Sequence, residues 1–138
     1  MAVRVRVNIS VGDKSLEAVA LINSGFETEE PQILIPMKAL RKLGLKLTGA
    51  VEDIYDTAGG PTRVWIYPEK ARISIIESKG KVVSEAIADI VISAIEDEVL
   101  IGDKLAGALK IMVEDFTEGI WRIKGGRRRR SEKPQRWR

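Results

Sequence analysis

The polar triad Asn23-Ser24-Gly25 joins two apolar runs, Ala20-Leu21-Ile22 before it and Ile33-Leu34-Ile35 after it. Asn, Ser and Gly are common turn residues, and an isolated triad of this kind indicates an ordinary surface turn. Here a fully apolar strand leads into the turn, so its small polar side chains are expected in a sheltered place where each needs a hydrogen-bond partner. A polar turn at the end of a buried strand is therefore a candidate functional site.

The residue types that are missing restrict the chemistry of such a site. The chain contains no histidine and no cysteine, which excludes disulfides, thiol nucleophiles, Ser-His or Cys-His catalysis and the usual zinc ligands. Hydrolysis would have to use carboxylates, hydroxyls, lysines or a hard metal ion bound by oxygen atoms. The acidic clusters at 27–30 and 96–98 lack EF-hand spacing, so we expect solvated loops there, with no metal and no other cofactor.

Length and composition indicate one folded domain. The 138 residues are 44% hydrophobic and 31% charged, as in a soluble globular protein with a sizeable core. We find neither an apolar run that could span a membrane nor a signal-peptide core, so a cytoplasmic location without membrane contact is expected. Abundant Glu, Lys and Arg beside few Asn and Gln resemble the residue usage of thermophiles.

The positive charge is concentrated at the C-terminal end. Residues 124–138 hold eight Lys/Arg and one Glu, giving +7, whereas residues 1–123 hold fifteen Lys/Arg and nineteen Asp/Glu, giving −4; the sum is the net +3. We therefore divide the chain into a domain at 1–123 and a basic tail at 124–138, which is expected to be disordered because it lacks apolar periodicity. Its arginine run could contact nucleic acid nonspecifically through phosphates or serve as a solubilising end; the run comprises Arg127, Arg128, Arg129 and Arg130.

The elements that must position the triad are mostly strands. Alternation of Val3, Val5, Val7 and Ile9 with polar residues predicts a half-buried strand, and residues 16–22 form a second strand that enters the core. Further strands are expected at 32–35, 51–57, 62–67, 71–77, 81–92, 99–101, 110–116 and 119–123. One short helix should begin near Pro36 and end at Gly44, and another should run from a capping Asp103 to about Leu109. This pattern predicts an all-β domain, a closed or rolled sheet with one or two short helices.

The segment Ala20-Leu21-Ile22-Asn23-Ser24-Gly25 resembles the active-site strand and loop of the retropepsin-like (clan AA) aspartic peptidases, whose motif is apolar-apolar-Asp-[Ser/Thr]-Gly. Phe26 after the glycine is similar to an archaeal subgroup with Asp-[Ser/Thr]-Gly-Phe. Other segments resemble the family in the same order, and the resemblance covers about residues 3–123. They are Ile33-Leu34-Ile35-Pro36 with a helix ending Lys42-Leu43-Gly44-Leu45, the second family signature Val99-Leu100-Ile101-Gly102, and Asp115-Phe116 with Gly119-Ile120 in the closing hairpin.

The resemblance implies a small β-barrel that pairs with a second copy about a twofold axis and takes an extended peptide as substrate. In that family two aspartates share one proton; the ionised one activates a water, and the protonated one donates to the peptide carbonyl. By resemblance, Ser24 would hydrogen-bond across the dimer axis, Gly25 would make the sharp turn, and Gly102 would allow close packing of the loop. Ala58, Gly59 and Gly60 would form the tip of a flap that closes over the substrate.

The sequence departs from the family pattern at the catalytic position, which is Asn23. An amide has nearly the shape of a carboxylate but is barely basic, so we expect a chain that folds and dimerises without hydrolysing peptides by this route. Three explanations are open: a natural pseudo-enzyme that binds extended peptides, an inactivating substitution in an active peptidase, or slow deamidation to Asp. The alternative functions are a non-catalytic peptide-binding module and nonspecific nucleic-acid binding through the tail.

Overall fold

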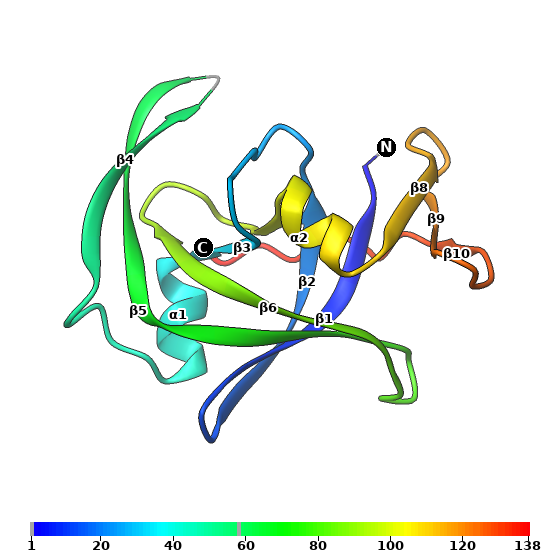
Figure 1. Cartoon of the computed structure of the whole chain (residues 1–138), viewed down its shortest axis with the longest axis horizontal. Helices are drawn as coiled ribbons and strands as arrows, with labels where there is room; N and C mark the ends of the chain where they lie inside the picture. The colour runs from blue at the N-terminus through cyan, green and yellow to red at the C-terminus, as the bar shows by residue number, and fades with distance from the viewer. Residues whose placement is uncertain (1, 58) are drawn as a thin grey trace.

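The structure is a computed structural model that describes residues 2–57 and 59–138 (Figure 1). Within these residues short strands dominate and two helices are present. In chain order the elements are β1 (Arg4–Val11), β2 (Lys14–Ile22), β3 (Gln32–Pro36), α1 (Met37–Leu43), β4 (Val51–Thr57), β5 (Gly60–Ile76), β6 (Val82–Ser93), β7 (Val99–Ile101), α2 (Asp103–Ala108), β8 (Ile111–Asp115), β9 (Ile120–Ile123) and β10 (Arg129–Arg130). None of the helices among the described residues is long and apolar enough to cross a membrane.

Six strands close a barrel in the order β1-β2-β7-β3-β6-β5, and β5 pairs back with β1. The pairs β2–β7 and β3–β6 are parallel, and the other four pairs are antiparallel. The closure follows from strands with one apolar face: Val5, Val7 and Ile9 of β1 have no exposed surface, and the residues between them face outward. The prediction of an all-β domain with a closed sheet and two short helices is confirmed.

The helix α1 follows β3 directly and lies against the barrel. Pro36 is its N-cap residue, and Gly44 ends it in the left-handed conformation at φ 90°, as the sequence predicts. The expected capping role of Asp103 in α2 is wrong, since the N-cap is Gly102 and makes no side-chain capping bond. Asp103 is instead the first helical residue, and its Oδ1 accepts hydrogen bonds from the backbone N–H groups of Lys104 and Thr28.

A long hairpin extends beyond the barrel. Its described residues, 51–57 and 59–66, include β4 and the first part of β5, and it is called the flap below (Figure 1). The strands expected at 62–67 and 71–77 are one strand of seventeen residues, β5. Its register against β6 shifts between Ile66 and Lys70, so Pro68 lies in an irregular stretch, where a strand tolerates the missing N–H.

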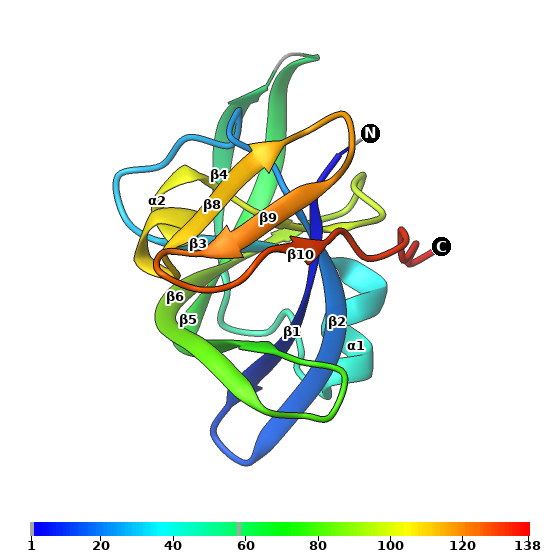
Figure 2. The same cartoon turned by 90° about the vertical axis from the view of Figure 1, so that its right-hand side faces the viewer.

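Residues 124–138 lie along the body rather than away from it. β10 adds to β9 and β8 as the third strand of a small second sheet, and the chain then runs behind β1 and β2 (Figures 1 and 2). The backbone N–H of Glu132 donates to the carbonyl of Arg4 at 2.9 Å, and that of Trp137 donates to the carbonyl of Asp97 at 2.7 Å. This arrangement differs from the disorder expected from the sequence. The carboxylates and carbonyls that hold the segment belong to elements far away in the sequence, so no local pattern indicates these contacts.

Candidate functional site

The loop after β2 begins with a tight turn that hydrogen bonds hold together. The backbone N–H of Asn23 donates to the carbonyl of Ile101 at 2.9 Å, and the N–H of Phe26 donates back to the carbonyl of Asn23 at 3.0 Å. The side-chain Oδ1 of Asn23 accepts the N–H of Gly25 at 3.0 Å. This local bond sets the rotamer of Asn23, and a carboxylate oxygen at the same position could accept it equally.

Residues at the junction between β7 and α2 contact this turn and fix its position. A Cβ atom on Gly102 would lie 2.4 Å from the carbonyl oxygen of Phe26, so only glycine fits at this close approach. The same carbonyl accepts the N–H of Asp103 at 3.1 Å, and the carboxylate of Asp103 accepts the N–H of Thr28 at 3.2 Å. The loop that carries Asn23 is thereby attached to a rigid part of the barrel.

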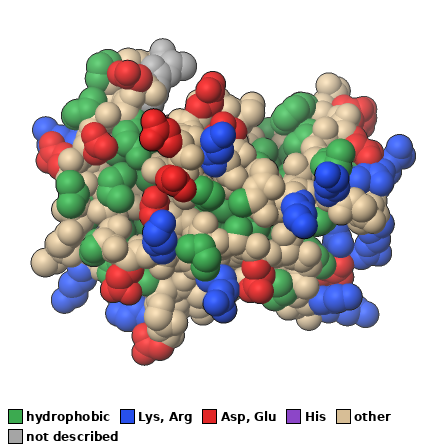
Figure 3. Space-filling model, in the orientation of Figure 1, with side chains coloured by type: hydrophobic (Ala, Val, Ile, Leu, Met, Phe, Trp, Pro, Cys, Tyr) green, Lys and Arg blue, Asp and Glu red, His purple; other side chains and the backbone are tan. Residues whose placement is uncertain are grey.

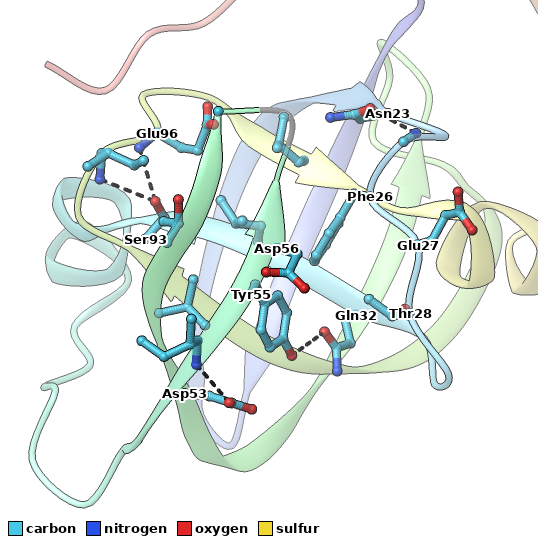
Figure 4. Close-up of a pocket in the computed structure, with 18 of the residues that line it drawn as sticks. Asn23, Phe26, Glu27, Thr28, Gln32, Asp53, Tyr55, Asp56, Ser93 and Glu96 are labelled. Atoms are coloured by element: carbon cyan, nitrogen blue, oxygen red, sulfur yellow. Dashed lines mark hydrogen bonds between the residues drawn. The ribbon is translucent and has the colours of Figure 1, made fainter.

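A cleft of about 1070 Å³ lies between this loop and the flap (Figure 4). Its floor is apolar and includes Leu34 of β3, Val64 of the flap and Leu100 of β7. These three side chains, together with Val91, form a buried cluster separate from the main barrel core. The cleft therefore combines an apolar floor with polar walls, which is the usual constitution of a ligand site.

The flap is attached to the barrel by Tyr55, which lies in its distal half. Its hydroxyl donates a hydrogen bond to Oε1 of Gln32 at 2.9 Å (Figure 4), and its ring lies 6.4 Å from the ring of Phe26, tilted by 38°. Burial raises the pKa of Tyr55, and the nearby carboxylates of Asp53 and Asp89 raise it further, while the bond to Gln32 acts against them. Tyr55 is thus a neutral hydrogen-bond donor near neutral pH.

The structure brings three of the residues predicted for the site to one cleft. Asn23 and Gly25 line it from the loop, and Gly59 lines it from the flap, whereas Ser24 is exposed at the outside of the turn. Gly60 has φ 104°, in the region that favours glycine. Ala58, predicted for the flap tip, lies outside the described residues.

The predicted nucleic-acid residues lie elsewhere, beside the second sheet. The guanidinium of Arg129 lies 5.9 Å from the centroid of the Trp121 ring and pairs with Glu77 at 2.9 Å. Arg128 pairs with Glu114 at 3.0 Å. Arg127 and Arg130 are exposed, so the run does not present four free guanidinium groups.

Several residues of the cleft were not identified from the sequence. Gln32 of β3 and Tyr55 of the flap meet through a hydrogen bond. Ser93 shapes the loop after β6, because its buried Oγ accepts the N–H groups of Ile95 and Glu96. The only signal for Tyr55 was its position in a strand of alternating character. Within residues 2–57 and 59–138, no group of three or more acidic side chains is arranged to hold a metal ion.

No protein-family model matches the chain, and no curated protein matches it. The fold and the site define the class of protein: an all-β barrel of six strands with a flap over a cleft. Within that class, the loop at Asn23 and the cleft are the features that bear on the function of the protein.

Proposed function

We propose that the chain is a retropepsin-like, aspartic-peptidase-fold protein that forms a homodimer and binds an extended peptide in the cleft without hydrolysing it. The observation that carries the proposal is the position of Asn23: it directly follows the buried end of β2 and lines a cleft that the flap borders on the opposite side. The order of the family-like motifs along the chain supports the same assignment. A cleft with an apolar floor suits an extended ligand.

The absence of hydrolysis follows from the chemistry of the amide. Two aspartates that meet at a twofold axis share one proton, and the ionised partner activates water. Two Asn23 side chains have no such proton to share, and an amide oxygen is too weak a base to activate water near neutral pH. The bond from Gly25 to Oδ1 of Asn23 at 3.0 Å is compatible with either residue, so the substitution removes the chemistry and leaves the turn.

Nucleic-acid binding through the tail is the less favoured function. In residues 124–138, Arg129 pairs with Glu77, Arg136 with Glu98 and Arg138 with Asp97. Phosphate groups would have to compete with these carboxylates for the same guanidinium groups. The tail therefore offers much less free positive charge than its sequence suggests.

The substitution Asn23→Asp tests the proposal. In the homodimer it restores the shared carboxylate pair, and we expect pepstatin-sensitive cleavage of a peptide library at a pH between about 3 and 7. Cleavage by the unchanged chain should be lower by about 10²-fold to 10⁴-fold or more, as expected for loss of general acid–base catalysis. Mass spectrometry of the digests identifies the cut bonds.

The chain offers a matched control in Asn8→Asp. Asn8 is the other asparagine, lies on β1 away from the cleft, and bonds the hydroxyl of Ser10 at 2.9 Å. The same change of one amide to a carboxyl at this position should leave the protein inactive. An Asn23→Asp protein that is dimeric and folded, yet cleaves no peptide anywhere in this pH range, would refute the peptidase ancestry of the site.

A further inference from the structure

The walls of the cleft are strongly and uniformly acidic. Among the twenty described residues that line it, six are Asp or Glu and none is Lys or Arg. The carboxylates come from three separate segments, namely the loop after β2, the flap and the loop after β6 (Figure 4). The six are Glu27, Glu29, Glu30, Asp53, Asp56 and Glu96.

Several carboxylates outside the cleft are neutralised by ion pairs. Glu98 pairs with Arg4 at 2.7 Å, and Glu132 pairs with Arg6 at 2.7 Å. In the described part of the chain, no ion pair within 4 Å includes any of the six cleft carboxylates. In the space-filling view, acidic side chains gather over and beside the flap (Figure 3). Within the described residues, the negative charge of the cleft walls is therefore not neutralised by direct ion pairs.

This charge surrounds an apolar floor. Leu34, Val64 and Leu100 are less than 10% exposed and belong to one packed cluster. In the flap, burial and then the carboxylates of Asp53 and Asp89 raise the pKa of Tyr55, which agrees with a negative potential there. A ligand that fits must place apolar groups on the floor and positive groups at the walls.

Building on the peptide-binding function proposed above, on which it rests, we infer that the cleft selects an extended basic peptide. Apolar side chains of that peptide contact the floor at Leu34, Val64 and Leu100, and its Lys or Arg side chains reach the carboxylates of the loop and the flap. In an extended chain, successive side chains point to opposite sides, so apolar and basic residues can alternate between floor and walls. The long stems of Lys and Arg cover apolar surface while their charged ends reach the rim.

Three fluorescein-labelled peptides of about ten residues test this selection. They share Val and Leu at alternate positions and differ only in the intervening residues, which are all Arg, all Gln or all Glu. Binding to the full chain is measured by fluorescence anisotropy at about 50 mM and about 500 mM NaCl, because salt screens exposed charges. We expect the Arg peptide to bind about tenfold more tightly than the Gln peptide at low salt, the Glu peptide to bind most weakly, and the difference to shrink at high salt.

Two double substitutions, one inside and one outside the cleft, test whether the cleft carboxylates cause the preference for basic peptides. The double substitution Glu29→Gln and Glu30→Gln removes two exposed carboxylates of the cleft and should weaken the Arg peptide severalfold while leaving the Gln peptide unchanged. The matched control, Glu69→Gln with Glu118→Gln, removes two exposed carboxylates outside the cleft lining and should change neither. Circular dichroism confirms that both proteins are folded.

The outcomes separate the two proposals. If no peptide binds, whatever its charge, the peptide-binding function itself fails. If the Gln peptide binds as tightly as the Arg peptide, the peptide function stands and the selection of basic residues is refuted. If the control variant weakens the Arg peptide as much as the cleft variant does, the attraction belongs to the whole surface and the inference is also refuted.

Discussion

At the scale of single residues, the strictest requirement in the site is the absence of a side chain at Gly102. Gly102→Ala would place a methyl group 2.4 Å from the backbone oxygen of Phe26 and 2.8 Å from Cδ2 of its ring, and a backbone oxygen cannot move aside as the end of a flexible side chain can. We expect the free energy of unfolding to fall by about 1–3 kcal/mol, the usual cost of overpacking. Urea denaturation followed by tryptophan fluorescence measures the change.

Gly107 provides the matched control for this substitution. It lies in α2, five residues further on, and a Cβ atom there would meet nothing within 4 Å. Gly107→Ala should therefore stabilise the protein slightly, by about 0.5–1 kcal/mol, because alanine has the higher helix propensity. Equal effects of the two substitutions would contradict the close-contact explanation.

One part of the candidate site could be predicted from the sequence, and the other part could not. Asn23 and Gly25 were identified because an apolar strand that leads into a polar turn is a local pattern. The contact between Tyr55 and Gln32 joins residues 23 positions apart, and nothing local in either segment indicates it. The same holds for the acidic walls, since their three segments come together only when the barrel closes.

At the scale of elements, the strands could be predicted from local sequence patterns, whereas the course of the tail could not. The alternation in β1 and the Pro36 and Gly44 signals of α1 are local, so the sequence alone was sufficient for them. β5 was expected as two strands because Pro68 interrupts its pattern, and only pairing with β4 and β6 makes it one. The tail lacks apolar periodicity, and its arginines are held by carboxylates of distant elements.

The position of the tail should depend on pH. Glu77 bonds Arg129, Asp97 bonds Arg138, and these hydrogen bonds are the main reason that the pKa of each carboxyl lies below its ordinary value. A carboxyl whose pKa is lower in the folded state contributes stability above its unfolded pKa and loses it as pH falls through the folded pKa. We therefore expect residues 127–138 to detach as pH falls from about 4 downward while the barrel stays folded.

Backbone ¹⁵N relaxation measures this detachment directly. The heteronuclear NOE of the tail amides should be high at pH 6 and low at pH 3, with little change in β1 and β2. At pH 6, Glu77→Gln should lower the NOE around Arg129, because it removes the charge of the carboxylate that the arginine contacts at 2.9 Å. Glu69→Gln, on an exposed residue of β5, should not. A tail that is equally rigid at both pH values would disprove this dependence.

At the scale of the whole molecule, the net charge of +3 is the sum of a negatively charged part, residues 1–123, and a positively charged tail, residues 124–138. The basic tail lies behind β1 and β2 and neutralises carboxylates there, such as Glu98. In the described protomer, the six carboxylates of the cleft make no ion pair within 4 Å. A protein of positive net charge can therefore attract a basic peptide, because the local potential rather than the net charge acts on a bound ligand.

The proposed homodimer has its own test at the margin of the cleft. Ile95 borders the cleft and is 71% exposed, and a second copy that covered it would remove this apolar surface from water. We expect light scattering to give the mass of two copies of 15.3 kDa and Ile95→Glu to raise the dissociation constant more than about tenfold, since each side chain enters a symmetric interface twice. Ile87→Glu, on a side chain of β6 that is 50% exposed and outside the cleft lining, should leave the mass unchanged. A monomeric mass for the unchanged chain at high concentration would exclude the dimer and, with it, the pairing of two Asn23 side chains across an axis.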